Sequence, residues 1–96
     1  MIEKDGNVYR VTLPMVIVNA RALLHAGRAL LGAEAERALL LDLALVREAD
    51  SSALAVLFAL RRAAAARGLS LSVVNPPPGL LSLAGLYGVT GSLPLA

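Results

Sequence analysis

The sequence contains no cysteine and no tryptophan, and only 3% of its residues are aromatic. Without cysteine the chain can form no disulfide framework and offers no thiol nucleophile or thiolate metal site, which fits a reducing compartment. Single-stranded nucleic acids usually bind where basic residues alternate with stacking aromatics. Here the net charge is only +2 and the arginines are scattered. We therefore expect no nucleic-acid partner.

Catalytic and metal-binding residues are equally scarce. The only histidine, His25, lies between Arg21 and Arg28, where we expect a solvated position on a helix. A Ser-His-acid triad would have to recruit this histidine from another helix. The sequence has neither a phosphate-binding glycine-rich loop with its lysine nor paired metal ligands at a recognisable spacing. We predict that the protein is not an enzyme and uses neither a metal nor a cofactor.

Long apolar runs are also missing. The longest ones, such as residues 53–60, fall well below the roughly 18 residues that a membrane span needs. The first ten residues carry Glu3, Lys4, Asp5 and Arg10 instead of the apolar segment of a signal peptide. We expect a cytoplasmic protein that does not insert directly into a membrane.

What is present is apolar content of 57% in 96 residues, enough for one domain, residues 1–96, with one modest core. Apolar runs and alternation predict strands at 8–13, 38–43 and 69–74 and a short or edge strand at 15–18. The run 38–43 is also compatible with a helix by composition. Helical spacing and capping residues predict three helices, at 20–31 after Asn19, at 51–67 after Asp50, and around 80–87. This order predicts an α/β fold: a small, mixed, mostly parallel sheet of about four strands with helices packed on it.

Asp50, Ser51 and Ser52 open the second predicted helix. Free N–H groups at a helix N-terminus favour oxygen acceptors, so Asp50 or Ser51 is expected to cap the helix. Capping is compatible with a second role of these residues in binding a partner.

On a helical wheel, the second helix has a core face and an opposite face. Leu54, Phe58, Arg61 and Arg62 fan out away from the core residues, which are Val56, Leu57, Leu60 and Ala64. An apolar stripe edged by arginine is common at protein interfaces. Phe58 is predicted either to join this stripe or to pack against a neighbouring helix.

The last third of the chain carries no charge at all, since no charged residue follows Arg67. A solvated helix normally displays charge, so some of this uncharged surface must be exposed or covered by a partner. We interpret Leu81, Gly85 and Leu86, together with the start of the second helix, as one docking surface. Membrane-surface binding is the rival interpretation, but interfacial helices usually carry lysine or arginine on their polar face.

The segment Leu40-Leu41-Asp42-Leu43, followed after seven residues by Asp50-Ser51-Ser52-Ala53-Leu54, resembles the central signature of STAS domains, the family named for sulphate transporters and anti-sigma factor antagonists. The predicted order of strands and helices fits this family over nearly the whole chain. Ala53 stands where the family usually has glycine, and Ala44 where serine often follows Asp-Leu. Residues 75–89 are similar to the closing helix of the STAS subunits of Mla-type phospholipid ABC transporters.

This resemblance implies a non-catalytic accessory subunit that binds and supports the transporter's ATPase subunit at the cytoplasmic side of the inner membrane. The predicted partner-binding residues are Asp50, Ser51, Ser52, Ala53, Leu54, Phe58, Leu81, Gly85 and Leu86.

The alternative function is that of an anti-sigma factor antagonist, which competes for a kinase-type anti-sigma factor and is regulated by phosphorylation. By resemblance the phosphorylated residue is Ser52, while Ser51 matches the Thr or Ser of the Mla-type subunits. A third class, a lipid- or nucleotide-binding module, and homodimerisation are both left open.

Overall fold

The computed structural model describes all 96 residues and has one four-stranded sheet. The elements in chain order are β1 Ile2–Asp5, β2 Val8–Val11, α1 Ile17–Gly32, β3 Ala38–Asp42, α2 Ser51–Ala66, β4 Ser70–Val74, α3 Pro78–Leu86 and the 3-10 helix η1 Thr90–Ser92. The strand order is β1-β2-β3-β4, in which β1 pairs antiparallel with β2 and the other pairs are parallel. The predicted α/β fold with a mixed, mostly parallel sheet is therefore confirmed.

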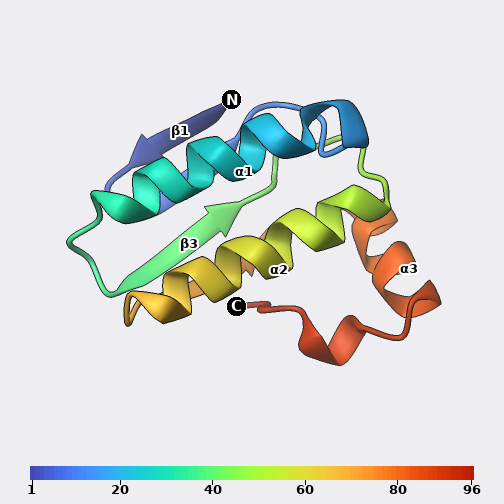
Figure 1. The fold of residues 1–96 in the computed structure, drawn as a ribbon. Coiled ribbons are helices and arrows are strands. Elements are labelled where there is room, and N and C mark those ends of the chain that lie inside the picture. The colour runs from blue at the N-terminus through green and yellow to red at the C-terminus, as the bar shows by residue number, and fades with distance from the viewer.

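Helices α1 and α2 lie side by side on one face of the sheet (Figure 1). The strands alternate, so that Tyr9, Leu41 and Val73 are buried under these helices. The intervening residues, such as Val8 and Leu40, are only half-buried because no helix packs on the other face. Val56, Leu57, Leu60 and Ala64 of α2 are buried in the core, as the helical wheel predicted.

Strand β1 was not predicted from the sequence. Ile2–Asp5 contains three charged residues and no apolar alternation, yet it pairs along its length with β2. Gly6, with a φ of 59°, and Asn7 form the turn of this hairpin instead of merely preceding a strand. Because β1 is an edge strand with exposed charged side chains, pairing with β2 decides its conformation more than its composition does.

The predicted strand at 15–18 is wrong. Met15 makes only an isolated bridge to Ala49, and α1 already begins at Ile17. Asn19 is not the N-cap; Val16 occupies that position without a capping side chain, and the Asn19 amide donates to the Pro14 carbonyl at 2.9 Å. The helix ends at Gly32, one residue beyond the predicted range 20–31.

Helix α3 begins at Pro78, two residues before Leu80, because a proline is well suited to the first turn of a helix. Leu80 and Ala84 are buried, whereas Tyr87, inside the predicted range of the helix, lies after its end and is 58% exposed. Beyond Gly88, η1 and an isolated parallel bridge between Val73 and Leu95 bring the C-terminus back to the edge of the sheet.

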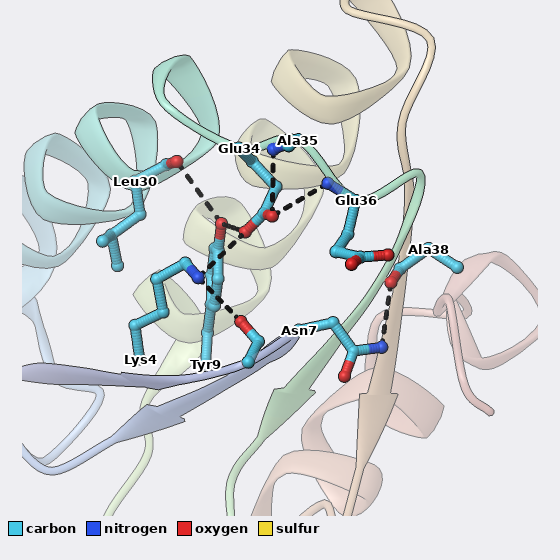
Figure 2. Close-up of polar contacts among 9 residues, drawn as sticks. Lys4, Asn7, Tyr9, Leu30, Glu34, Ala35, Glu36 and Ala38 are labelled. Carbon is cyan, nitrogen blue, oxygen red and sulfur yellow. Dashed lines mark hydrogen bonds and ion pairs between the residues drawn. The ribbon is translucent and has the colours of Figure 1, made fainter.

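A polar cluster fixes the C-terminal end of α1 to the sheet (Figure 2). The Tyr9 hydroxyl donates to Glu34 Oε1 at 2.5 Å, and Lys4 Nζ lies 3.7 Å from the same oxygen. Burial, and then the bond to Glu34, raises the pKa of Tyr9 well above its usual range. The Tyr9 hydroxyl also lowers the pKa of Glu34, mainly through this bond. The cluster thus holds the end of the molecule that is remote from the start of α2.

Helices α1 and α2 touch closely at Gly27. A Cβ at this position would come within 2.6 Å of Leu60 Cδ2. A side chain at residue 27 would therefore require the Leu60 side chain to shift or the two helices to move apart. No helix in the molecule has the length and apolarity required to traverse a lipid bilayer.

Candidate docking site

Asp50 caps α2 and at the same time holds α1. Its Oδ1 accepts hydrogen bonds from the Ser52 backbone N–H at 2.9 Å and from the Ser52 hydroxyl. Its Oδ2 accepts from the backbone N–H of Ile17, the first residue of α1, at 2.9 Å. The Ser52 hydroxyl, followed by the Ile17 N–H, lowers the pKa of Asp50, so this group stays ionised at neutral pH. One carboxylate therefore aligns the N-terminal ends of both helices.

The backbone of the preceding loop reinforces this alignment. Met15 N–H donates to the Glu48 carbonyl at 2.9 Å, and Asp50 N–H donates to the Met15 carbonyl at 3.1 Å. These are the bonds of the parallel bridge between Met15 and Ala49. The position of the Asp-Ser-Ser turn is thus set by residues far away in the sequence.

The two serines of this turn differ in their surroundings. Ser51 is exposed and its hydroxyl has no partner in the chain, whereas Ser52 is half-buried and donates to Asp50. Ser51 shares a groove with Tyr87 and Val89, which follow α3, whereas Ser52 shares a groove with residues of α1. Of the two predicted caps, Asp50 is the one that caps α2, and Ser51 is left free for contact.

Ala53 and Leu54 correct our expectation of an outward-facing surface. Ala53 is fully buried and Leu54 is only 5% exposed, because they face the core and α3 instead of solvent. Ala53 therefore offers no surface to a partner. Leu54 instead forms part of the floor of a groove.

This groove, called here the α2/α3 groove, is lined by Ser51, Leu54, Phe58, Tyr87 and Val89 and has a volume of about 300 Å³. Its lining carries no charge. Phe58 is half-buried, packed against the core with part of its ring open to the groove. The sequence did not assign Tyr87 and Val89 to the site, although both belong to the uncharged last third of the chain.

Large apolar side chains are exposed around the same end of the molecule, where α1 and α2 begin and α3 lies (Figure 1). Leu81 and Leu86 of α3 are 37% and 79% exposed, and Gly85 is exposed too. Ile17 and Val18, at the start of α1, are 72% and 82% exposed. Apolar surface of this extent in a small domain is typical of a protein-binding site.

A second carboxylate, Asp42, holds the start of the segment that leads to α3. Its Oδ1 accepts from the Asn75 side-chain amide at 3.0 Å and from the Ala44 N–H at 2.9 Å, while Arg10 Nε lies 3.4 Å from Oδ2. The Asn75 amide, followed by the Ala44 N–H, lowers the pKa of Asp42. Asn75 itself has a φ of 54°, which asparagine tolerates better than most residues. Asp42 thus supports the site without lining it.

No three His, Cys, Asp or Glu side chains come together in a way that could hold a metal ion. The site consists of a capped helix start, an uncharged groove and exposed apolar side chains. Such an arrangement is suited to binding another polypeptide.

Comparison with solved structures defines the class of fold. The anti-sigma factor antagonist SpoIIAA of Bacillus matches in its unphosphorylated form with a TM-score of 0.75 at 14% identity, covering 100% of this chain and 86% of that one. An anti-sigma factor antagonist from Mycobacterium paratuberculosis matches with a TM-score of 0.69 at 26% identity, covering 99% and 81%. A putative anti-sigma factor antagonist from Thermotoga maritima gives 0.68 at 20% identity, covering 93% and 80%. These structures share the α/β fold described above.

The family model described as MlaB, STAS domain, matches residues 4–95. The chain therefore belongs to the STAS domain family, and it is most like the MlaB branch of that family. No curated protein sequence gives a significant match.

Proposed function

We propose that this protein is an accessory subunit that binds the ATPase subunit of an Mla-type phospholipid ABC transporter through the α2/α3 groove and the apolar side chains around it. The main observation that supports this proposal is the uncharged groove beside the start of α2, which Asp50 caps. Membership of the MlaB branch supports the choice of partner. In this role the protein sits at the cytoplasmic side of the inner membrane through its partner, and it catalyses nothing itself.

The arrangement of side chains explains how such docking would work. Leu86 protrudes from α3 and can enter an apolar pocket of the ATPase, while Tyr87 supplies an aromatic wall with a polar tip. Ser51, whose hydroxyl has no partner in the chain, can bond to a polar group of the ATPase at the rim. The bonds of Asp50 to both helix starts keep these groups in place before binding, which lowers the entropic cost of association.

Binding to purified ATPase tests this proposal. We expect an Mla-type ATPase from the same organism to form a stable complex with this protein, and Leu86→Arg to weaken it by about tenfold or more. Leu95→Arg is the matched control, because Leu95 is also exposed, but it lies at the β4 edge of the sheet. Isothermal titration calorimetry measures both affinities. Failure of the wild-type protein to bind the ATPase, or an equal loss in the two variants, would contradict the proposal.

An anti-sigma factor antagonist is the second candidate, favoured by a specific observation. SpoIIAA, which shares the fold, has been solved in a phosphorylated form. In this chain Ser52 is the residue that the family resemblance assigns to phosphorylation, and its hydroxyl is bonded to Asp50. A phosphate there would place about two negative charges next to the Asp50 carboxylate, which would disturb the cap of α2 and the hold on Ile17.

Incubation with a kinase-type anti-sigma factor and ATP, followed by mass spectrometry, distinguishes the two candidates. Under the accessory-subunit proposal, neither Ser51 nor Ser52 gains phosphate. Stoichiometric phosphorylation of Ser52 by such a kinase would instead support the antagonist. A Ser52→Ala variant controls for phosphorylation at other sites.

A further inference from the structure

A second groove runs on the other side of α2, between α1 and α2, with a volume of about 470 Å³. We call it the α1/α2 groove. It is lined by Ile17, Ala20, Arg21, Leu24, Arg28, Ser52, Ala55, Val56, Ala59 and Arg62. The lining residues of each helix follow an i, i+3, i+4, i+7 pattern, so each helix contributes one continuous stripe. The groove therefore follows the length of the two parallel helices.

The charged residues that line this groove are all arginines, and the Asp50 carboxylate, bonded to the Ile17 N–H and to Ser52, lies at the end where both helices begin. Neither α1 nor α2 contains an acidic residue, and all seven carboxylates of the chain lie on strands or loops. Arg21, Arg28 and Arg62 make no hydrogen bond or ion pair within the molecule. By contrast, Arg61 and Arg67 donate to the carbonyls of Ser92 and Gly32 at 3.0 and 3.1 Å. Three unpaired guanidinium groups therefore surround the groove.

The floor of the α1/α2 groove is formed by apolar side chains, most of them small. Ala20, Ala55 and Ala59 have side chains of a single methyl group, and Leu24 is half-buried between the two helices. Small residues let the backbone of a third helix approach to the 8–10 Å or so that separates packed helices. A groove between two parallel helices thus has the right shape for a helix lying along it.

Other occupants fit less well. The groove lacks an aromatic side chain on which a nucleic-acid base could stack. A bilayer surface would leave a concave strip between two helices unfilled, whereas peripheral membrane helices bury a protruding apolar face. An amphipathic helix with carboxylates on both flanks complements both the shape and the charge.

We propose that the α1/α2 groove binds an acidic amphipathic helix of a partner protein. The apolar face of this helix rests on Ala20, Leu24 and Ala55, and its carboxylates pair with Arg21, Arg28 and Arg62. Arg21 and Arg28 are two helical turns apart, about 10 Å along α1. Acidic residues spaced seven apart on the partner helix would therefore face both arginines. The proposal can be tested separately from the docking of an ATPase, because α2 lies between the two grooves, although Ile17 at the start of α1 belongs to both surfaces.

A designed peptide tests the chemistry directly. The probe is a helical peptide of about 18 residues with leucines at positions i, i+3, i+4 and i+7 and glutamates seven apart on one flank. The matched peptide carries glutamine in place of every glutamate. We expect the acidic peptide to bind the full-length protein, with NMR shifts confined to α1 and α2, and the glutamine peptide to bind at least about tenfold more weakly.

Charge-reversal variants assign the contact to the groove. The double variant Arg21→Glu, Arg62→Glu should weaken binding of the acidic peptide by about tenfold or more. Arg37→Glu is the matched control, since Arg37 is exposed on the loop before β3 and outside the groove. Leu86→Arg should leave peptide affinity unchanged, so this test can fail independently of the ATPase test.

A photo-crosslinking residue at Ala55 identifies the natural occupant in cells that produce the protein, with one at Ser70 as the control. A crosslinked protein segment that is helical and acidic on one flank supports the proposal. Equal binding of the glutamine peptide, or an unaltered affinity of the double variant, would overturn it. So would binding to phosphatidylglycerol vesicles but not to the acidic peptide, because the groove would then be a membrane contact.

Discussion

Helix α2 has two grooves at its sides, and they differ in charge although one helix helps to form both. The α2/α3 groove is lined by uncharged residues, and the protruding side chains beside it are Leu86 and Tyr87. The α1/α2 groove has an alanine-rich floor and three arginines without a partner. Adjacent serines mark the division, since Ser51 lines the first groove and Ser52 the second.

This difference shows that net charge is a poor guide to the surface of this protein. The net charge of +2 does not show that α1 and α2 contain no acidic residue, nor that the C-terminal third of the chain carries no charge. Interfaces that depend on apolar burial and interfaces that depend on charge respond differently to salt, because screening weakens only the second kind strongly. The two grooves should therefore be separable by mutation and by ionic strength.

The largest effect on stability is expected from a substitution in the core beneath both grooves. Leu57 of α2 is fully buried, so Leu57→Ala removes core packing beneath both grooves. We expect the free energy of unfolding to fall by about 2–5 kcal/mol. Urea denaturation monitored by circular dichroism measures it. A loss below about 1 kcal/mol would show that α2 is not anchored as described; the exposed Ala55→Ser change serves as the control.

A smaller and one-sided effect is expected at Gly27. The side chain in Gly27→Leu would collide with Leu60 and push α1 and α2 apart, widening only the α1/α2 groove. Overpacking of this kind typically costs about 1–3 kcal/mol. Gly27→Leu should lose binding of the acidic peptide. At low temperature, where this variant stays folded, it should keep the contacts between α2 and α3. Gly32→Leu, at a helical position with open space around it, is the matched control, and equal unfolding curves for the two variants would contradict the close contact.

The adjacent serines give the next comparison. Ser51→Glu adds charge to the uncharged groove and should weaken ATPase binding by about tenfold, with little change in thermal stability. Ser52→Glu places a carboxylate beside Asp50, so it should lower the melting temperature by about 4 °C or more through loss of the cap. Differential scanning calorimetry and titration with ATPase measure the two readouts. Interchanged results would show that the two residues face the opposite grooves.

The sequence predicted the elements whose stability is local. Periodicity and capping residues placed α2, β3 and β4 within two residues of their observed bounds. The cap of α2 was expected to be Asp50 or Ser51, and it is Asp50, whose partner is two residues away. The charge-free stretch after Arg67 also pointed correctly to exposed apolar residues on α3.

Elements that depend on distant contacts were missed. Val16, Ile17 and Val18 have β-branched side chains that favour a strand, but the carboxylate of Asp50 caps Ile17 from 33 residues away and starts a helix there. Charged β1 forms because it pairs with β2. The helical wheel placed Leu54 on the solvent-exposed side because a wheel considers α2 alone, whereas in the structure α3 packs against α2. The unpaired state of Arg21, Arg28 and Arg62 is likewise visible only in three dimensions.

The smallest and most selective effects are expected from substitutions of Asp42 and Asp50, the two carboxylates that hold the segments beside the grooves. Asp42 holds Asn75, at the start of the segment leading to α3, while Asp50 holds the start of α1. The pKa of Asp42 is lowered in the folded protein, so its stabilising contribution is fully present above its unfolded pKa of about 3.9 and disappears as the pH falls through the lower folded value.

Asp42→Asn should consequently be less stable than the wild type near neutral pH, and the difference should shrink toward zero as the pH is lowered below about 4. Hydrogen exchange at pH 7 should accelerate near Asn75 and α3 but not at the start of α1, because the bonds of Asp50 remain intact. Asp50→Asn is the reciprocal variant, with faster exchange expected at Ile17 and Ser52. A constant stability difference across this pH range would mean that ionised Asp42 contributes nothing, and faster exchange on both sides in either variant would mean that the two sides of α2 open as one unit.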